Sequence, residues 1–87
     1  MNNKQILGAL ALDLKRVAVG LNRGSVAMAE RFLQEAVKRR DEINIKQIKP
    51  YLSIFLRKID HIKKDGGQKS AEEALMYSTI FQNASQA

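Results

Sequence analysis

Few side chains in this 87-residue sequence could act as an acid, a base, a nucleophile or a metal ligand. Histidine is the side-chain type that exchanges protons near neutral pH, and the sequence contains only one, His61. At 100° per residue, His61 lies about 150° from the apolar stripe of its expected helix and therefore faces solvent. Cysteine is absent, which excludes disulfides, thiol chemistry and thiolate metal sites.

The carboxylates and glycines also lack the arrangement that a catalytic or phosphate-binding site needs. Glu72 and Glu73 are adjacent, so on a helix they point about 100° apart and fit best as first-turn charges favoured by the helix dipole. The segment 65–67, Asp-Gly-Gly, lacks the P-loop pattern and indicates a turn between helices. The Glu-x-x-His motif of bundle di-metal sites is absent. We therefore expect no enzymatic activity, no metal and no cofactor.

Positive charge suggests one possible binding surface. The net charge is +6, and residues 45–69 hold seven basic side chains against two acidic ones. If residues 45–64 form one helix, then Lys46, Arg57 and Lys64 fall at about the same angle, opposite the apolar stripe. This row, about 27 Å long at 1.5 Å per residue, is a candidate polyanion-binding site that predicts weak, non-sequence-specific binding of nucleic acid. The competing interpretation is a basic surface that only keeps the protein soluble.

Apolar residues spaced by three and four predict the helices that must position these side chains. The expected helices span residues 3–22, 26–41, 45–64 and 71–83. Ser25 is the expected N-cap of the second helix, and Ser70 with Glu73 forms a capping box for the fourth. The apolar phase of the third continues across Pro50, which favours a kink there over a helix that starts at Pro50.

Together these helices predict a small antiparallel bundle. Short connections make neighbouring helices antiparallel, and no alternating apolar pattern supports a sheet. We expect one all-α domain over residues 1–87, since a chain of this size supports a single core. The residues nearest the stripe centres, and hence expected to be buried, are Leu10, Leu14, Leu33, Phe55 and Ile59.

Two apolar residues on the first helix lie outside its stripe. Leu12 and Val19 are seven residues apart and roughly opposite the stripe, and Gly8 and Ala9 beside them would allow close approach of another helix. A two-fold homodimer is the commonest way to cover such a seam, so the sequence predicts self-association through Leu12 and Val19. The alternative is a central first helix that its own chain covers on both sides.

The function class that remains is a binding protein. We expect a non-enzymatic protein-interaction or regulatory module, with the nucleic-acid binding described above as the alternative. Asp13 interrupts the first apolar run before it reaches the length of a membrane span, and the helix lacks the Trp or Phe of an interfacial helix. We therefore expect no membrane association and a cytoplasmic location.

Overall fold

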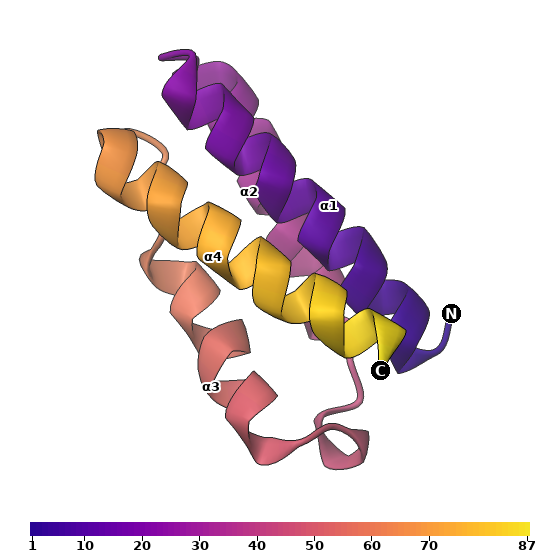
Figure 1. Cartoon of the computed structure of the whole chain (residues 1–87). Coiled ribbons are helices and arrows are strands. Elements are labelled where there is room, and N and C mark those ends of the chain that lie inside the picture. The colour runs from indigo at the N-terminus through magenta and orange to yellow at the C-terminus, as the bar shows by residue number, and fades with distance from the viewer.

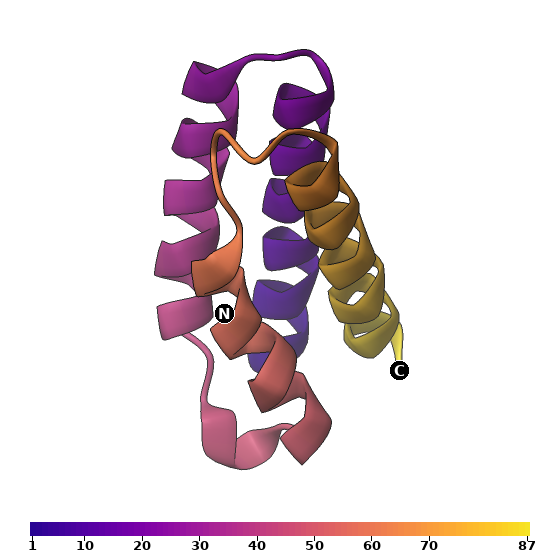
Figure 2. The same cartoon turned by 90° about the vertical axis from the view of Figure 1, so that its left-hand side faces the viewer.

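The computed structural model describes residues 1–87 and shows an all-helical chain (Figure 1). The α-helices are α1 (Asn3–Asn22), α2 (Val26–Asp41), α3 (Pro50–Lys58) and α4 (Gly67–Gln86), and 3-10 turns occupy Ile45–Gln47 and Ile59–His61. The three long helices form one layer in which α1 packs between α2 and α4, while α3 crosses one face of that layer (Figure 2). The predicted all-α bundle of four helices is confirmed.

Local signals at both ends explain why α1 and α2 have the predicted bounds. At the start of α1, the Asn2 side chain accepts a hydrogen bond from the Gln5 backbone, and the Gln5 side chain accepts one from the Asn2 backbone, a capping box. Gly24 follows α1 with φ +70°, a conformation that glycine adopts without strain. Ser25 then caps α2 by accepting the Met28 N–H at 3.2 Å.

The third expected helix is broken into separate pieces, so the prediction of one kinked helix over residues 45–64 is wrong. After the first 3-10 turn, Ile48 and Lys49 are extended, and α3 begins at Pro50. Proline disfavours helical backbone in the residue before it and is well suited to the first helical position. α3 ends at Lys58, and after the second 3-10 turn Ile62 is again extended.

The last helix begins four residues before the predicted start and runs three residues past the predicted end. Ser70 is not its N-cap; this side chain is buried, and its Oγ accepts the backbone N–H of Lys63 at 3.4 Å. Gly67 opens α4 with φ +62°. The capping-box pattern is therefore present in the sequence, but the Ser70 hydroxyl closes the preceding loop instead.

The core lies between the three-helix layer and α3. Leu10, Leu14 and Ile59 are buried as predicted. Leu33 and Phe55 are only half-buried, which corrects the predicted core list. The reason for Phe55 is that α3 turns Leu52 and Leu56 inward, leaving Phe55 at the edge with its ring 5.8 Å from that of Tyr77.

α1 and α2 approach each other closely at Gly20. A Cβ atom at Gly20 would lie 2.9 Å from the backbone nitrogen of Ala29, closer than real Cβ contacts. At Gly8, also within α1, a Cβ atom would meet only the Ser85 side chain at 3.7 Å, an ordinary contact. Glycine at position 20 therefore sets the distance between α1 and α2.

Alanine substitutions at these two glycines should change stability in opposite directions. Gly20→Ala should lower the free energy of unfolding by about 1–3 kcal/mol, because α2 must move away. Gly8→Ala should raise it by up to about 1 kcal/mol, because alanine is the better helix former and space is available. Urea unfolding of both variants checks this, and a stabilised Gly20→Ala variant would contradict the close approach.

Candidate interaction surface

The structure does not form the predicted basic row. Lys46 lies in the first 3-10 turn, Arg57 lies in α3, and Lys64 lies in the loop before α4. The row required residues 45–64 to be one helix, and the breaks around Pro50 and Ile62 remove that condition. Lys64 is also engaged, since its Nζ lies 3.2 Å from Glu30 Oε1 on α2.

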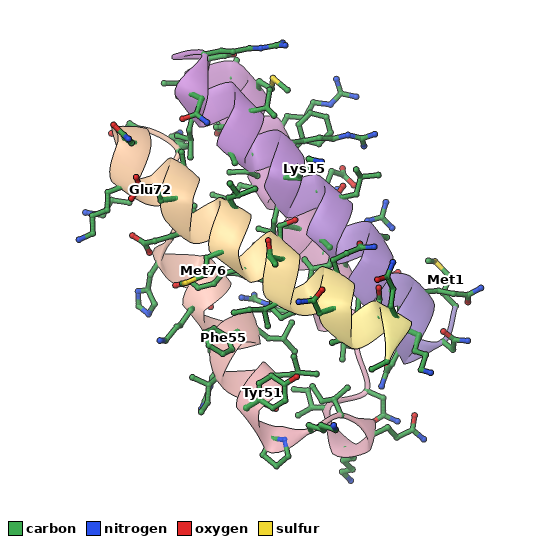
Figure 3. The ribbon with its side chains drawn as sticks, in the orientation of Figure 1. Met1, Lys15, Tyr51, Phe55, Glu72 and Met76 are labelled. Carbon is green, nitrogen blue, oxygen red and sulfur yellow. The ribbon has the colours of Figure 1, made fainter.

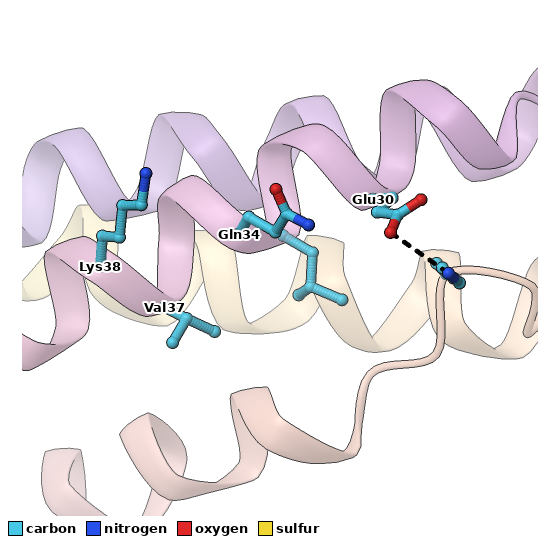
Figure 4. A pocket seen from close by; sticks show the side chains of 6 residues that line it. Glu30, Gln34, Val37 and Lys38 are labelled. Carbon is cyan, nitrogen blue, oxygen red and sulfur yellow. Dashed lines mark ion pairs between the residues drawn. The ribbon is translucent and has the colours of Figure 1, made fainter.

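This ion pair lies at one end of an open groove beside α2 (Figure 4). The lining side chains are Glu30, Leu33, Gln34, Val37, Lys38 and Lys64, around about 470 Å³. The groove explains why Leu33 is only half-buried, because α3 does not cover this part of α2. No group of three or more His, Asp or Glu side chains in the chain lies close enough to hold a metal ion.

A buried ion pair joins α1 to α2. Asp13 is only 3% exposed, and its Oδ2 lies 2.6 Å from Nε of Arg39. In the sequence, Asp13 is visible only as a charge that interrupts an apolar run. Its partner is 26 residues away and becomes evident once the two helices are paired.

A second arginine joins α2 to the end of α3. Nη1 of Arg40 donates to Asp60 Oδ1 at 2.7 Å and to the Leu56 carbonyl at 3.4 Å, while Nε donates to Asp41 Oδ1 at 3.3 Å. Burial by itself lowers the pKa of Arg40, but the hydrogen bond and charge of Asp60, followed by those of Asp41, outweigh it and raise the pKa above its usual value. Arg40 therefore remains charged and holds α3 in place.

Apolar side chains are exposed along the seam between α3 and α4. Figure 3 shows Tyr51 and Phe55 of α3 and Met76 of α4 along this seam, and Tyr51 and Met76 are about half exposed. Tyr77 lies beneath them, where burial raises its pKa and the charge of Glu73 raises it further. The seam is an extension of the core at which packing is incomplete.

A different surface contains the residues predicted to self-associate. The layer of α2, α1 and α4 is covered by α3 on one side only, and we call the uncovered side the open face (Figures 1 and 2). Leu12, at the centre of the open face, is 47% exposed, whereas Val19 is partly covered. α1 is thus central, as in the alternative stated from the sequence, but its own chain leaves Leu12 accessible.

α4 contributes an apolar residue that the sequence analysis missed. Leu75 is 49% exposed and lines one groove together with Leu12, Lys15 and Thr79. In the sequence its only signal was an apolar residue outside the stripe of the last helix. Its position beside Leu12 follows from the pairing of α1 with α4, which is also fixed by a 2.6 Å hydrogen bond from Ser78 Oγ to the Ala11 carbonyl.

The opposite edge of the open face is basic and aromatic. Phe32 of α2 is half-buried, and the guanidinium carbons of Arg16 and Arg31 lie 5.3 and 5.4 Å from its ring centroid. Such distances are within the range of cation–π attraction. Toward α4 the open face therefore has two exposed leucines set among mostly polar side chains, called the apolar part below, and toward α2 it has a cationic part.

The chain matches no known protein family, and no similar curated protein or solved structure was found. None of the helices is long and apolar enough to cross a membrane.

Proposed function

We propose that this chain is a non-enzymatic protein-interaction module that forms a homodimer through the apolar part of its open face. The observation that carries the proposal is the placement of Leu12 and Leu75, each about half exposed, on the two sides of one groove. Monomeric proteins expose single apolar residues freely, but two adjacent ones on neighbouring helices make a strip that a second copy can cover.

A two-fold axis parallel to α1 suits this strip. Such an axis sets α1 of one copy over α4 of the other, so that the two Leu12–Leu75 pairs meet in one apolar layer. The paired helices are then antiparallel, the arrangement that the chain already uses between α1 and α4 (Figure 1). Each copy presents the same surface, as a closed dimer requires.

The assignment to the non-enzymatic class is supported by the state of the titratable groups. His61 is an isolated exposed side chain. Asp13, Arg39, Arg40 and Asp60 are engaged in ion pairs that join helices. We also propose a cytoplasmic location, since a small domain without cysteine does not use the disulfides common in secreted proteins.

Light scattering during gel filtration tests the dimer. The parent should have the mass of two chains, and Leu12→Glu should have the mass of one, because a charge would be placed in the apolar layer. Ile54→Glu is the matched control, since Ile54 of α3 is also 47% exposed but lies away from the open face. We expect Ile54→Glu to remain dimeric.

Two outcomes contradict this assignment. A parent that is monomeric at high concentration removes the dimer altogether. A dimeric parent whose mass is unchanged by Leu12→Glu, and also by Leu12→Glu/Val19→Glu, shows that the interface lies on another surface. The far-ultraviolet circular dichroism of each variant confirms that it has folded.

A further inference from the structure

We propose that Arg16, Arg31 and Phe32, at the α2 edge of the open face, form a binding site for single-stranded nucleic acid. The three side chains are called the arginine clamp below. This site differs from the basic row expected from the sequence. Leu12 lies one turn before Arg16 on α1, so the site borders the proposed dimer interface, but Arg31 and Phe32 lie on the α2 side of α1 and Leu75 lies on the α4 side. Binding at this site therefore does not require a dimer.

The two arginines of the clamp have no acidic partner. Four other cationic side chains, Lys38, Arg39, Arg40 and Lys64, each lie within 4 Å of a carboxylate oxygen. Neither Arg16 nor Arg31 does, and both are exposed. Glu35, one turn after Arg31, pairs with Lys38 at 3.8 Å instead. Most lysines and arginines of the chain also lack such a partner, so the feature that distinguishes the clamp is that two unpaired arginines lie against one ring.

Phe32 holds these charges together. Because both guanidinium carbons lie within 5.4 Å of the same ring centroid, they are no more than about 11 Å apart. Both charges can therefore act on the same short stretch of a bound polyanion. The ring also restricts both side chains before a ligand arrives, which reduces the entropy lost on binding.

The chemistry of the clamp favours a nucleic acid over an acidic peptide. Guanidinium groups bind carboxylate and phosphate oxygens alike in a bidentate manner, but their planes also stack on bases, and an acidic peptide offers no base to stack on. Arg23 lies seven residues after Arg16, on nearly the same side of α1 and about 10 Å along its axis at 1.5 Å per residue. Arg23 is exposed and has no ion pair, so it extends the clamp toward a neighbouring phosphate.

The small size of this surface favours a single strand. Three arginines along one helix pair can follow only a few phosphates. A flexible single strand can bend its backbone to these positions and turn its bases toward the planar groups. Binding should be sequence-independent and weaken with salt.

Fluorescence anisotropy with a labelled single-stranded RNA of about 12 nucleotides, near the site sizes of single-strand binders, tests the clamp at about 50 and 200 mM salt. The parent should bind at the lower salt, and Arg16→Gln/Arg31→Gln should weaken binding about tenfold or more. Lys46→Gln/Arg57→Gln is the matched control, since it removes the same charge from residues outside the clamp. We expect its affinity to remain within about twofold of the parent. Equal thermal melting of the two double variants excludes a folding defect.

Further variants and competitors distinguish single-strand binding from other kinds of anion binding. Arg16→Lys/Arg31→Lys keeps the charge but loses the planar groups and should bind several-fold more weakly than the parent. Leu75→Gln, which interrupts the apolar strip without placing a charge one turn from Arg16, should bind like the parent, monomeric or not. The proposal is overturned if the parent does not bind or if both glutamine double variants lose affinity equally. It is also overturned if duplex RNA binds as tightly as the single strand, or if polyglutamate competes as well as unlabelled RNA, which indicates an acidic protein partner.

Discussion

Replacement of Phe81 by alanine is expected to lower the free energy of unfolding by about 3–5 kcal/mol. Phe81 of α4 is fully buried and is the largest of the completely enclosed side chains. The substitution would leave a cavity in the core that neighbouring side chains fill only in part. For a domain of this size, such a loss is a large share of the total stability, and urea unfolding measures it.

Phe55→Ala is the matched control, with the same change at a half-buried position. Its ring contacts that of Tyr77 but reaches solvent, and Lys58 lies 5.3 Å from its centroid. We expect a clearly smaller loss than at Phe81, because water can enter the space and less apolar surface is lost. An equal or larger loss for Phe55→Ala would show that the Phe55 side chain contributes more to packing than its half-buried position indicates.

Asp13→Leu is expected to lower the free energy of unfolding by about 2–3 kcal/mol. The substitution leaves Arg39 without its partner, and breaking a fully buried pair costs roughly 3–5 kcal/mol. A lower value is expected here because the Arg39 side chain is 33% exposed and can recover some hydration. Glu30→Gln, which breaks the exposed pair with Lys64, should cost at most about 1 kcal/mol.

A double variant separates the loss of the pair from the loss of packing. Asp13→Leu/Arg39→Leu should regain at least half of the stability lost in Asp13→Leu, because no unpaired charge remains beside the core. Urea unfolding of the three variants provides the double-mutant comparison. A double variant less stable than Asp13→Leu would mean that Arg39 stabilises the α1–α2 contact through its own packing.

The bounds of α1 and α2 were predictable from the sequence, because residues that cap or end a helix stand at their ends. Ser25 and Gly24 fix the boundary between α1 and α2 through interactions within a few residues, and such interactions are visible in a linear pattern. α3 was mispredicted because apolar spacing reports which side of the chain faces the core. It does not report whether the backbone between those positions is α-helical, 3-10 or extended.

The fourth helix shows a second kind of limit. Ser70 satisfies the capping-box pattern, yet its hydroxyl accepts a hydrogen bond from Lys63 in the preceding loop. The Ser70 hydroxyl could accept a hydrogen bond either from the helix backbone at Glu73 or from the Lys63 backbone, and the sequence does not show which of the two is preferred. The helix therefore starts at Gly67, where a positive φ permits the turn.

The open face was predictable only in part, because part of it depends on which helices are neighbours. The angular position of Leu12 indicates correctly that it faces away from the core. The groove shared with Leu75, and the approach of Arg16 to Phe32, depend on which helices are neighbours. The expected basic row was wrong because it assumed one continuous helix over residues 45–64.

The central position of α1 also sets an order of assembly during synthesis. α1 and α2 are adjacent in the sequence, so their hairpin can close as soon as residue 41 has left the ribosome. The other side of α1 meets α4, and the bond from Ser78 to Ala11 spans 67 residues. Until α4 is made, the nascent hairpin displays an apolar stripe, which is a binding site for chaperones and for α4 of another copy. Exchange of α4 between two chains, with residues 62–66 as the hinge, is therefore the misassembly to which this topology is most exposed.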